Sequence, residues 1–177
     1  MSGNSIIQGN LETLRQAKDV IHLMSNDIYC HTQAPHMQSS IGQHIRHLID
    51  NYLALQQGTE IGHVDYNWRR RGAEVETNKD IALLELEQLI NWLSRLSDTA
   101  LTQNLTLLSE VCLSETQSDF ATSTLHRELI FVASHSIHHL AIIGIGMRLQ
   151  NLTVPDHVGL APATASFLRQ QTEKKTA

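Results

Sequence analysis

The sequence predicts an all-α protein, a four-helix bundle with long crossover connections and a short C-terminal helix. Four stretches place apolar residues at steps of three, four or seven, the spacing of one helix face. The connections over residues 58–77 and 98–122 are long for a simple bundle, in which roughly 2–8 residues are usual. A chain of 177 residues favours a single domain, 1–177, with a C-terminal tail from about residue 152.

The first helix is expected over residues 4–26, where one face carries an apolar stripe. Its members are Ile7, Leu11, Leu14, Ile21 and Met24. The second helix is expected to begin at Ser40, because Gln43 three residues later completes a capping box. Gly58 is expected to mark its end, since glycine is common just past the last turn of a helix.

The third helix is expected over residues 78–97 and the fourth over residues 123–150. Pro155 prevents a long continuation of the fourth helix, and a short helix is expected over residues 164–170. Within the second long connection, the stretch NLTLLSEVCL at 104–113 could form a short extended piece against the bundle.

Composition and charge disfavour several classes of protein. A formal net charge of −5 with 18% charged residues disfavours a nucleic-acid binder, which normally carries a basic stripe. No apolar run approaches the roughly 18–20 residues of a membrane span, and the first residues lack the features of a signal peptide. Cys30 and Cys112 are isolated, as reduced thiols of a cytoplasmic protein would be. We therefore expect a cytoplasmic protein that binds neither membrane nor nucleic acid.

Histidine is abundant, and five of the 11 histidines fall in two clusters on expected helices. His135 and His139 are one turn apart and about 40° around the fourth helix, a spacing that can aim two imidazoles at one point. Both fall within the apolar stripe, so they need partners inside the bundle. A divalent cation would satisfy them together, with a further ligand from His44 or His47 on the second helix.

Alternatives stay open at this point. The same imidazoles could be hydrogen-bonded core residues with no metal, and helical spacing places His44 nearer the centre of its stripe than His47. The remaining histidines are scattered singly and are expected to be ordinary surface residues. They are His22, His31, His36, His63, His126 and His157.

The strings SIGQHIRHLIDNYLAL at 40–55 and SHSIHHLAII at 134–143 resemble the DinB/YfiT-like superfamily of bundle proteins, many of which hold a divalent metal on three histidines. The resemblance implies that His47, His135 and His139 are the ligands, with His44 as a supporting or alternative ligand. The sequence departs from the usual family pattern at Leu140 and Ala141, which replace a more polar stretch that contains arginine.

Three further groups are candidates for the site. Arg69 and Arg71, in the first long connection, could bind carboxylates of a small anionic substrate, or could instead form a solvated loop or a subunit contact. Glu128 lies two turns before His135 on nearly the same face and could accept an imidazole N–H. His138 is expected at the edge of the site.

The resemblance implies a metal-dependent enzyme that transfers a low-molecular-weight thiol to a small-molecule electrophile, with Zn, Ni, Mn or Fe as the ion and Arg69 or Arg71 holding the thiol. Hydrolysis, in which the same site activates water, is the alternative. A third interpretation is a non-catalytic metal-binding module for a stress response or for dimerisation. A homodimer is expected, because bundles of this size often pair through an apolar helix face.

Overall fold

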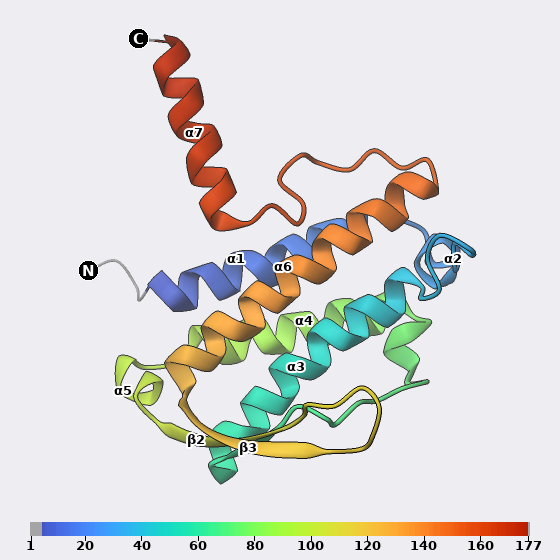
Figure 1. Cartoon of the computed structure of the whole chain (residues 1–177). Helices are drawn as coiled ribbons and strands as arrows, with labels where there is room; N and C mark the ends of the chain where they lie inside the picture. The colour runs from blue at the N-terminus through green and yellow to red at the C-terminus, as the bar shows by residue number, and fades with distance from the viewer. Residues whose placement is uncertain (1–4, 177) are drawn as a thin grey trace.

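Four long helices form the body of the protein, and the computed structural model describes residues 5–176 (Figure 1). These helices are α1 (Ser5–His22), α3 (Ile41–Ile61), α4 (Lys79–Ser94) and α6 (Leu125–Leu149). Helix α1 contacts α4 and α6, and α3 contacts α6 and α4. The described elements are completed by α2 (Asn26–Cys30), α5 (Asp98–Leu101), α7 (Pro162–Thr176), the 3₁₀ helix η1 (Glu74–Glu76), and strands β1 (His63–Asp65), β2 (Asn104–Glu110) and β3 (Ser118–Thr124).

The apolar stripes predicted from the sequence form one core. The largest fully buried side chains come from the helices that face one another: Tyr29, Tyr52, Leu14, Ile21, Ile41, Ile45, Leu48, Ile49, Leu55, Leu86, Leu89 and Leu93. Burial of such side chains stabilises the fold by roughly 1.5–3 kcal/mol each. The bundle is therefore held chiefly by helix-on-helix packing.

Helix boundaries follow the predicted capping signals at some ends only. Ser40 and Gln43 form the capping box, with each side chain bonded to the backbone of the other residue. Helix α1 ends at His22, and a separate short helix begins after Ser25, so the single helix expected over 4–26 is divided.

The predicted stop at Gly58 was wrong, because α3 continues to Ile61 and Gly62 is its C-cap. Gly62 has φ +76°, a left-handed conformation that glycine adopts without strain. Gly58 instead allows a close approach of β1, since a Cβ on it would lie 2.3 Å from Cγ2 of Val64. Close packing, rather than a turn, therefore accounts for this glycine.

Helices α4 and α6 lie within the predicted stretches, whereas α7 is longer than predicted and the short α5 lies in the second long connection. Helix α4 occupies most of 78–97, and α6 begins after its N-cap Thr124. Helix α7 runs from Pro162 to Thr176, longer than the predicted 164–170, and extends away from the bundle (Figure 1). Its basic residues Lys174 and Lys175 lie in the last turn, where positive charge is favourable.

The prediction of an all-α fold was wrong in one respect, because the long connections form a small three-stranded sheet. Its order is β1-β2-β3, with β1 parallel to β2 and β2 antiparallel to β3. Strand β2 contains most of the stretch expected to be extended, and it buries alternate residues, Leu105 and Leu107, against the helices. The sheet therefore covers one end of the bundle beside the start of α6 (Figure 1).

Helix α6 is the one helix among residues 5–176 that is long and apolar enough to cross a membrane by length and composition alone. In this fold 44% of its most apolar stretch is buried, and it packs against α1 and α3 as a core helix does.

A buried ion network fixes the first long connection to α3. Asp50 is fully buried and receives Arg46 Nη1 on Oδ2 and Arg70 Nε on Oδ1, both at 2.7 Å. Arg70 also makes a two-point contact with Glu85 on α4, and Arg46 Nε lies 2.6 Å from Glu76. The carboxylates of Asp50 and Glu85 thus tie the loop, through Arg70, to α3 and to α4.

We expect Asp50→Ala to lower the free energy of unfolding by about 3–5 kcal/mol, because it leaves two guanidinium groups without their shared partner. Urea denaturation measures the change. The matched control is Glu87→Ala, which removes an exposed partner of Lys18 and should cost about 1 kcal/mol or less. Similar losses in both variants would contradict a structural role for the buried network.

Candidate metal centre

Three imidazoles from two helices converge between α3 and α6. His47 Nε2 lies 2.8 Å from His135 Nε2, and His139 Nε2 lies 3.1 Å from the same atom. One nitrogen from each ring falls within 4.8 Å of the other two. These three residues are the set that the family resemblance implied from the sequence.

Helix geometry explains the convergence. His135 and His139 are one turn apart on α6, so their side chains share a face. Helix α3 runs antiparallel to α6, because His47 meets His135 while His44, earlier on α3, meets His139. Two residues on one helix and one on the other therefore reach a common point in the seam.

His44 contacts the outer side of the cluster. Its Nδ1 lies 3.0 Å from Nδ1 of His139, while Nε2 of His139 faces the other two imidazoles. A ring nitrogen that binds a cation must be unprotonated, which leaves Nδ1 of His139 to donate to His44. With a cation on Nε2, this hydrogen bond would fix the tautomer and the ring orientation of His139. His47 is thus placed in the triad and His44 behind it.

The surroundings keep the imidazoles uncharged. Burial, together with the nearby charge of Arg69 and the ring of His135, lowers the pKa of His47 to about 3. Burial and the neighbouring histidines lower the pKa of His139 to about 3 as well. Burial also lowers the pKa values of His44 and His135. Neutral imidazoles are the form in which histidine binds metals.

The cluster fits a divalent cation by its spacing. Nitrogens that coordinate zinc at 2.0–2.1 Å in a tetrahedron lie about 3.3 Å apart. The two separations from His135 Nε2, 2.8 and 3.1 Å, are close to this value. A single cation would accept the lone pairs of all three nitrogens. Without a cation the rings would have to hydrogen-bond to one another, and each neutral imidazole has only one N–H to donate. Three protein ligands leave a fourth position open, the pattern of catalytic rather than structural sites.

Of the two supporting candidates, His138 lies where it was expected, and Glu128 has other partners than expected. His138 is exposed, with its ring centroid 5.3 Å from that of His139, at the edge of the cluster. Glu128 is fully buried, but its carboxylate accepts hydrogen bonds from Tyr66 at 2.8 Å and from Ser123 at 2.6 Å. Its hydrogen bonds among the described residues therefore go to groups other than the imidazoles.

The two candidate arginines flank the cluster. Arg69 is half-buried, and its charge is one cause of the lowered pKa values of His47 and His135. Arg71 lines a cavity of about 520 Å³ together with His44, His47 and His139. Arg70, between the two arginines, points the other way to Asp50. The loop thus places two arginines beside the site and uses the third as its anchor.

The sequence reasoning did not identify Arg46 and Glu76, which also line the cavity beside the histidines. Arg46 is followed four residues later by Asp50, a spacing that pairs opposite charges on a helix. That spacing could have indicated the pair. Its burial depends on the loop that folds over it and could not be read from spacing.

Three solved structures of Bacillus proteins have a similar fold. A DinB-like protein from Bacillus subtilis superposes with a TM-score of 0.64 at 16% identity, covering 88% of this chain and 99% of the other. A DinB-like protein from Bacillus cereus gives 0.60 at 15% identity, with 85% and 93% covered. YfiT from Bacillus subtilis, described as a probable metal-dependent hydrolase with an unusual four-helix bundle topology, gives 0.61 at 16% identity, with 84% and 87% covered.

The chain has the DinB/YfiT-like fold. No family model matches the sequence. A curated relative, FK506-binding protein 5 from Rhizopus delemar, is 28% identical over 108 residues, which are 61% of this chain. The matched part is 28% of that protein's length, so the similarity is to a segment of a longer protein.

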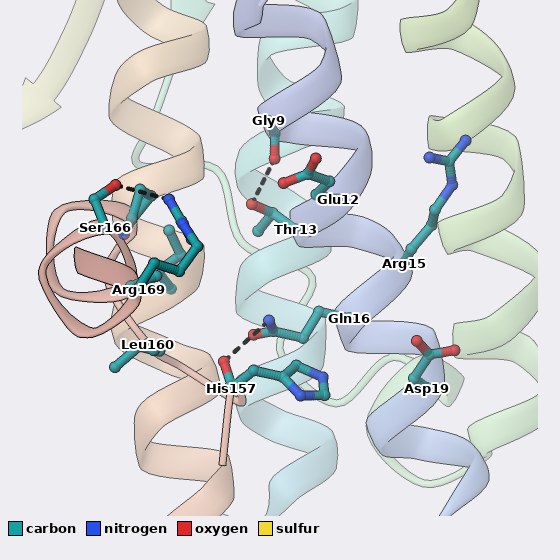
Figure 2. Close-up of a pocket in the computed structure, with 13 residues that line it drawn as sticks. Gly9, Glu12, Thr13, Arg15, Gln16, Asp19, His157, Leu160, Ser166 and Arg169 are labelled. Carbon is teal, nitrogen blue, oxygen red and sulfur yellow. Dashed lines mark hydrogen bonds between the residues drawn. The ribbon is translucent and has the colours of Figure 1, made fainter. Parts of the chain in front are cut away.

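Another cavity of this chain lies away from the histidine cluster. It has a volume of about 540 Å³ and lies between α1, α6 and the segment leading into α7 (Figure 2). Two hydrogen bonds join residues of its wall: Gln16 Nε2 donates to the carbonyl of His157, and Arg169 donates to Ser166 (Figure 2). It shares no residue with the cluster, so the cavity beside His47 remains the candidate site.

We expect His139→Ala to lower metal content well below the unsubstituted level, because it removes one of three nitrogens. Elemental analysis of untagged protein after loading with Zn, Ni, Mn or Fe measures the change. His157→Ala is the control, since that side chain is exposed and outside the cluster. Equal metal content in the two variants would contradict the assigned triad.

We expect His44→Ala to weaken metal affinity by about 10–100-fold, because partners behind a ligand orient it. Competition with a chelating dye measures the affinity, and His126→Ala, an exposed residue on α6, is the control. A complete loss of binding would instead indicate that His44 is itself a ligand. An unchanged affinity would show that its contact with His139 has no influence on the site.

Proposed function

We propose that the chain is a metal-dependent enzyme of the hydrolase type. The observation that carries the proposal is the convergence of three uncharged imidazole nitrogens beside a cavity lined by arginine. The description of YfiT as a probable metal-dependent hydrolase, in a protein of the same fold, supports it.

The chain's own residues would divide the work. His47, His135 and His139 would hold the ion, and His44 would hold the ring of His139 in the required tautomer. A bound divalent cation supplies a Lewis acid that polarises a carbonyl and lowers the pKa of a water or thiol.

Arg71, together with Arg69 near His47, would attract the anionic part of a substrate and orient it toward the imidazoles. Asp50 would keep the arginine loop in place through Arg70.

Thiol transfer is the second candidate function, supported by the resemblance of the motifs around His47 and His135 and by the arginines. Two guanidinium groups beside the cluster suit the carboxylates of a low-molecular-weight thiol. The ion, drawn from Zn, Ni, Mn or Fe, and the assembly as a cytoplasmic homodimer belong to the same proposal.

Turnover tests the enzymatic proposal. Protein loaded with each of the four metals would be given nitrophenyl esters in water, and separately a thiol with an electrophile. We expect product formation above that of a His135→Ala control, in which a ligand is lost. Release from esters without thiol supports hydrolysis, and strict dependence on thiol supports transfer. Metal-loaded protein that matches the control in every combination would contradict an enzyme.

A further inference from the structure

A second cleft lies at the other end of the histidine cluster, between the β2–β3 hairpin and the first turns of α6. Its volume is about 260 Å³. Most of its wall is apolar, formed by Tyr66, Leu107, Val111, Phe120, Ala121 and Phe131. Val111 and Phe120 are 60% and 65% exposed, so large apolar side chains gather at the mouth where water would otherwise contact them.

Phe131 lines this cleft and also contacts the metal centre. Its ring lies parallel to the imidazole of His135, at an interplanar angle of 19° and a centroid distance of 5.8 Å. Its edge contacts Tyr66, whose centroid is 5.3 Å away. The apolar cleft is thus one aromatic ring away from a nitrogen ligand of the proposed ion.

The charged groups of the cleft are already paired. Glu128 accepts hydrogen bonds from Tyr66, Ser123 and Arg127, at 2.8, 2.6 and 2.7 Å. Burial and the neighbouring Glu128 carboxylate raise the pKa of Tyr66, which keeps its hydroxyl protonated as the donor. Asp119, at the exposed rim, accepts from the backbone N–H of Phe120. This arrangement offers contact to an uncharged group.

We propose that the cleft binds an apolar group of the substrate, an aryl ring or a branched alkyl chain, whose reacting end lies at the three histidines. The inference rests on the proposed function and adds the substrate class. An apolar cavity of about 150 Å³ is sufficient to bind benzene, so this volume holds such a group and little more.

The two cavities beside the cluster differ in polarity, and this difference predicts how the substrate is oriented. The larger cavity, at the His44 and His139 end, is lined by Arg46, Arg71 and Glu76. The smaller cleft, at the Phe131 end, is mainly apolar. A substrate that places its scissile or electrophilic group at the centre would extend its polar part toward Arg71 and its apolar part under the hairpin.

The first test needs no metal. Benzyl alcohol is added to the metal-free protein, with glycerol as the polar control, and backbone amide shifts are recorded. We expect the largest shifts at the residues that line the cleft, and their loss in Ala121→Leu, which fills it. Ala163→Leu, the same change at an exposed position on α7, should leave them intact. Val111→Asp, which places a charge at the mouth, is the second variant. Shifts elsewhere, or binding that survives both cleft variants, would overturn the inference.

The second test asks whether one ligand can bind the ion and the cleft at the same time. Calorimetry compares acetohydroxamate with phenylalkyl hydroxamates of one to three methylenes on the metal-loaded protein. We expect the best phenylalkyl compound to bind at least about tenfold more tightly, and the ratio to approach one in Ala121→Leu. Metal-dependent binding with no preference for the phenyl group would overturn the cleft and leave the metal centre standing. Absence of metal binding would overturn the proposed function, while the benzyl alcohol result still decides the cleft.

Discussion

The antiparallel contact between α3 and α6 is the constraint on which the rest of the structure depends. Apolar residues of both helices bury themselves at this seam, including Leu48 and Ile143, and the same seam contains imidazoles. Polar rings in such a place are costly unless each nitrogen finds a partner. The contacts of His47 with His135, and of His44 with His139, provide those partners and fix the register of the helices. The packing of α3 against α6 therefore also sets the geometry of the site.

A second layer of organisation comes from charge. The arginine run at 69–71 lies in a connection without a core of its own, and a free loop would not hold its side chains in place. Asp50 resolves this by accepting Arg70 from the loop and Arg46 from its own helix. The loop consequently presents Arg69 and Arg71 beside the histidines. The ion pairs of Asp50 thus position Arg69 and Arg71, although neither of these two arginines belongs to the ion network.

The small sheet has a comparable role at the other end. Strand β1 follows the left-handed turn at Gly62 and lies close to Gly58, so the chain can reverse over the end of α3. Strands β2 and β3 then form a hairpin over the start of α6, with Phe120 and Phe131 on either side of a cleft. The metal centre is in this way bounded by a polar cavity on one side and an apolar one on the other.

Much of this protein was determined by local sequence. Periodic apolar residues predict the four long helices, the capping box at Ser40 predicts the start of α3, and the spacing of His135 and His139 predicts a shared face. Each of these signals lies within a few residues, at the range of helix hydrogen bonds.

Only the tertiary structure decided the grouping of His47 with His135 and His139, the pairing of Glu128 with Tyr66, and the strands within the long connections. These depend on partners distant in sequence. Helix spacing gives the direction of a side chain but not the rotation and axial shift of the helix opposite. His47 lies toward the edge of the apolar stripe of α3, yet it contacts His135 because of the way α6 is rotated against α3. The packing of the whole core sets that rotation.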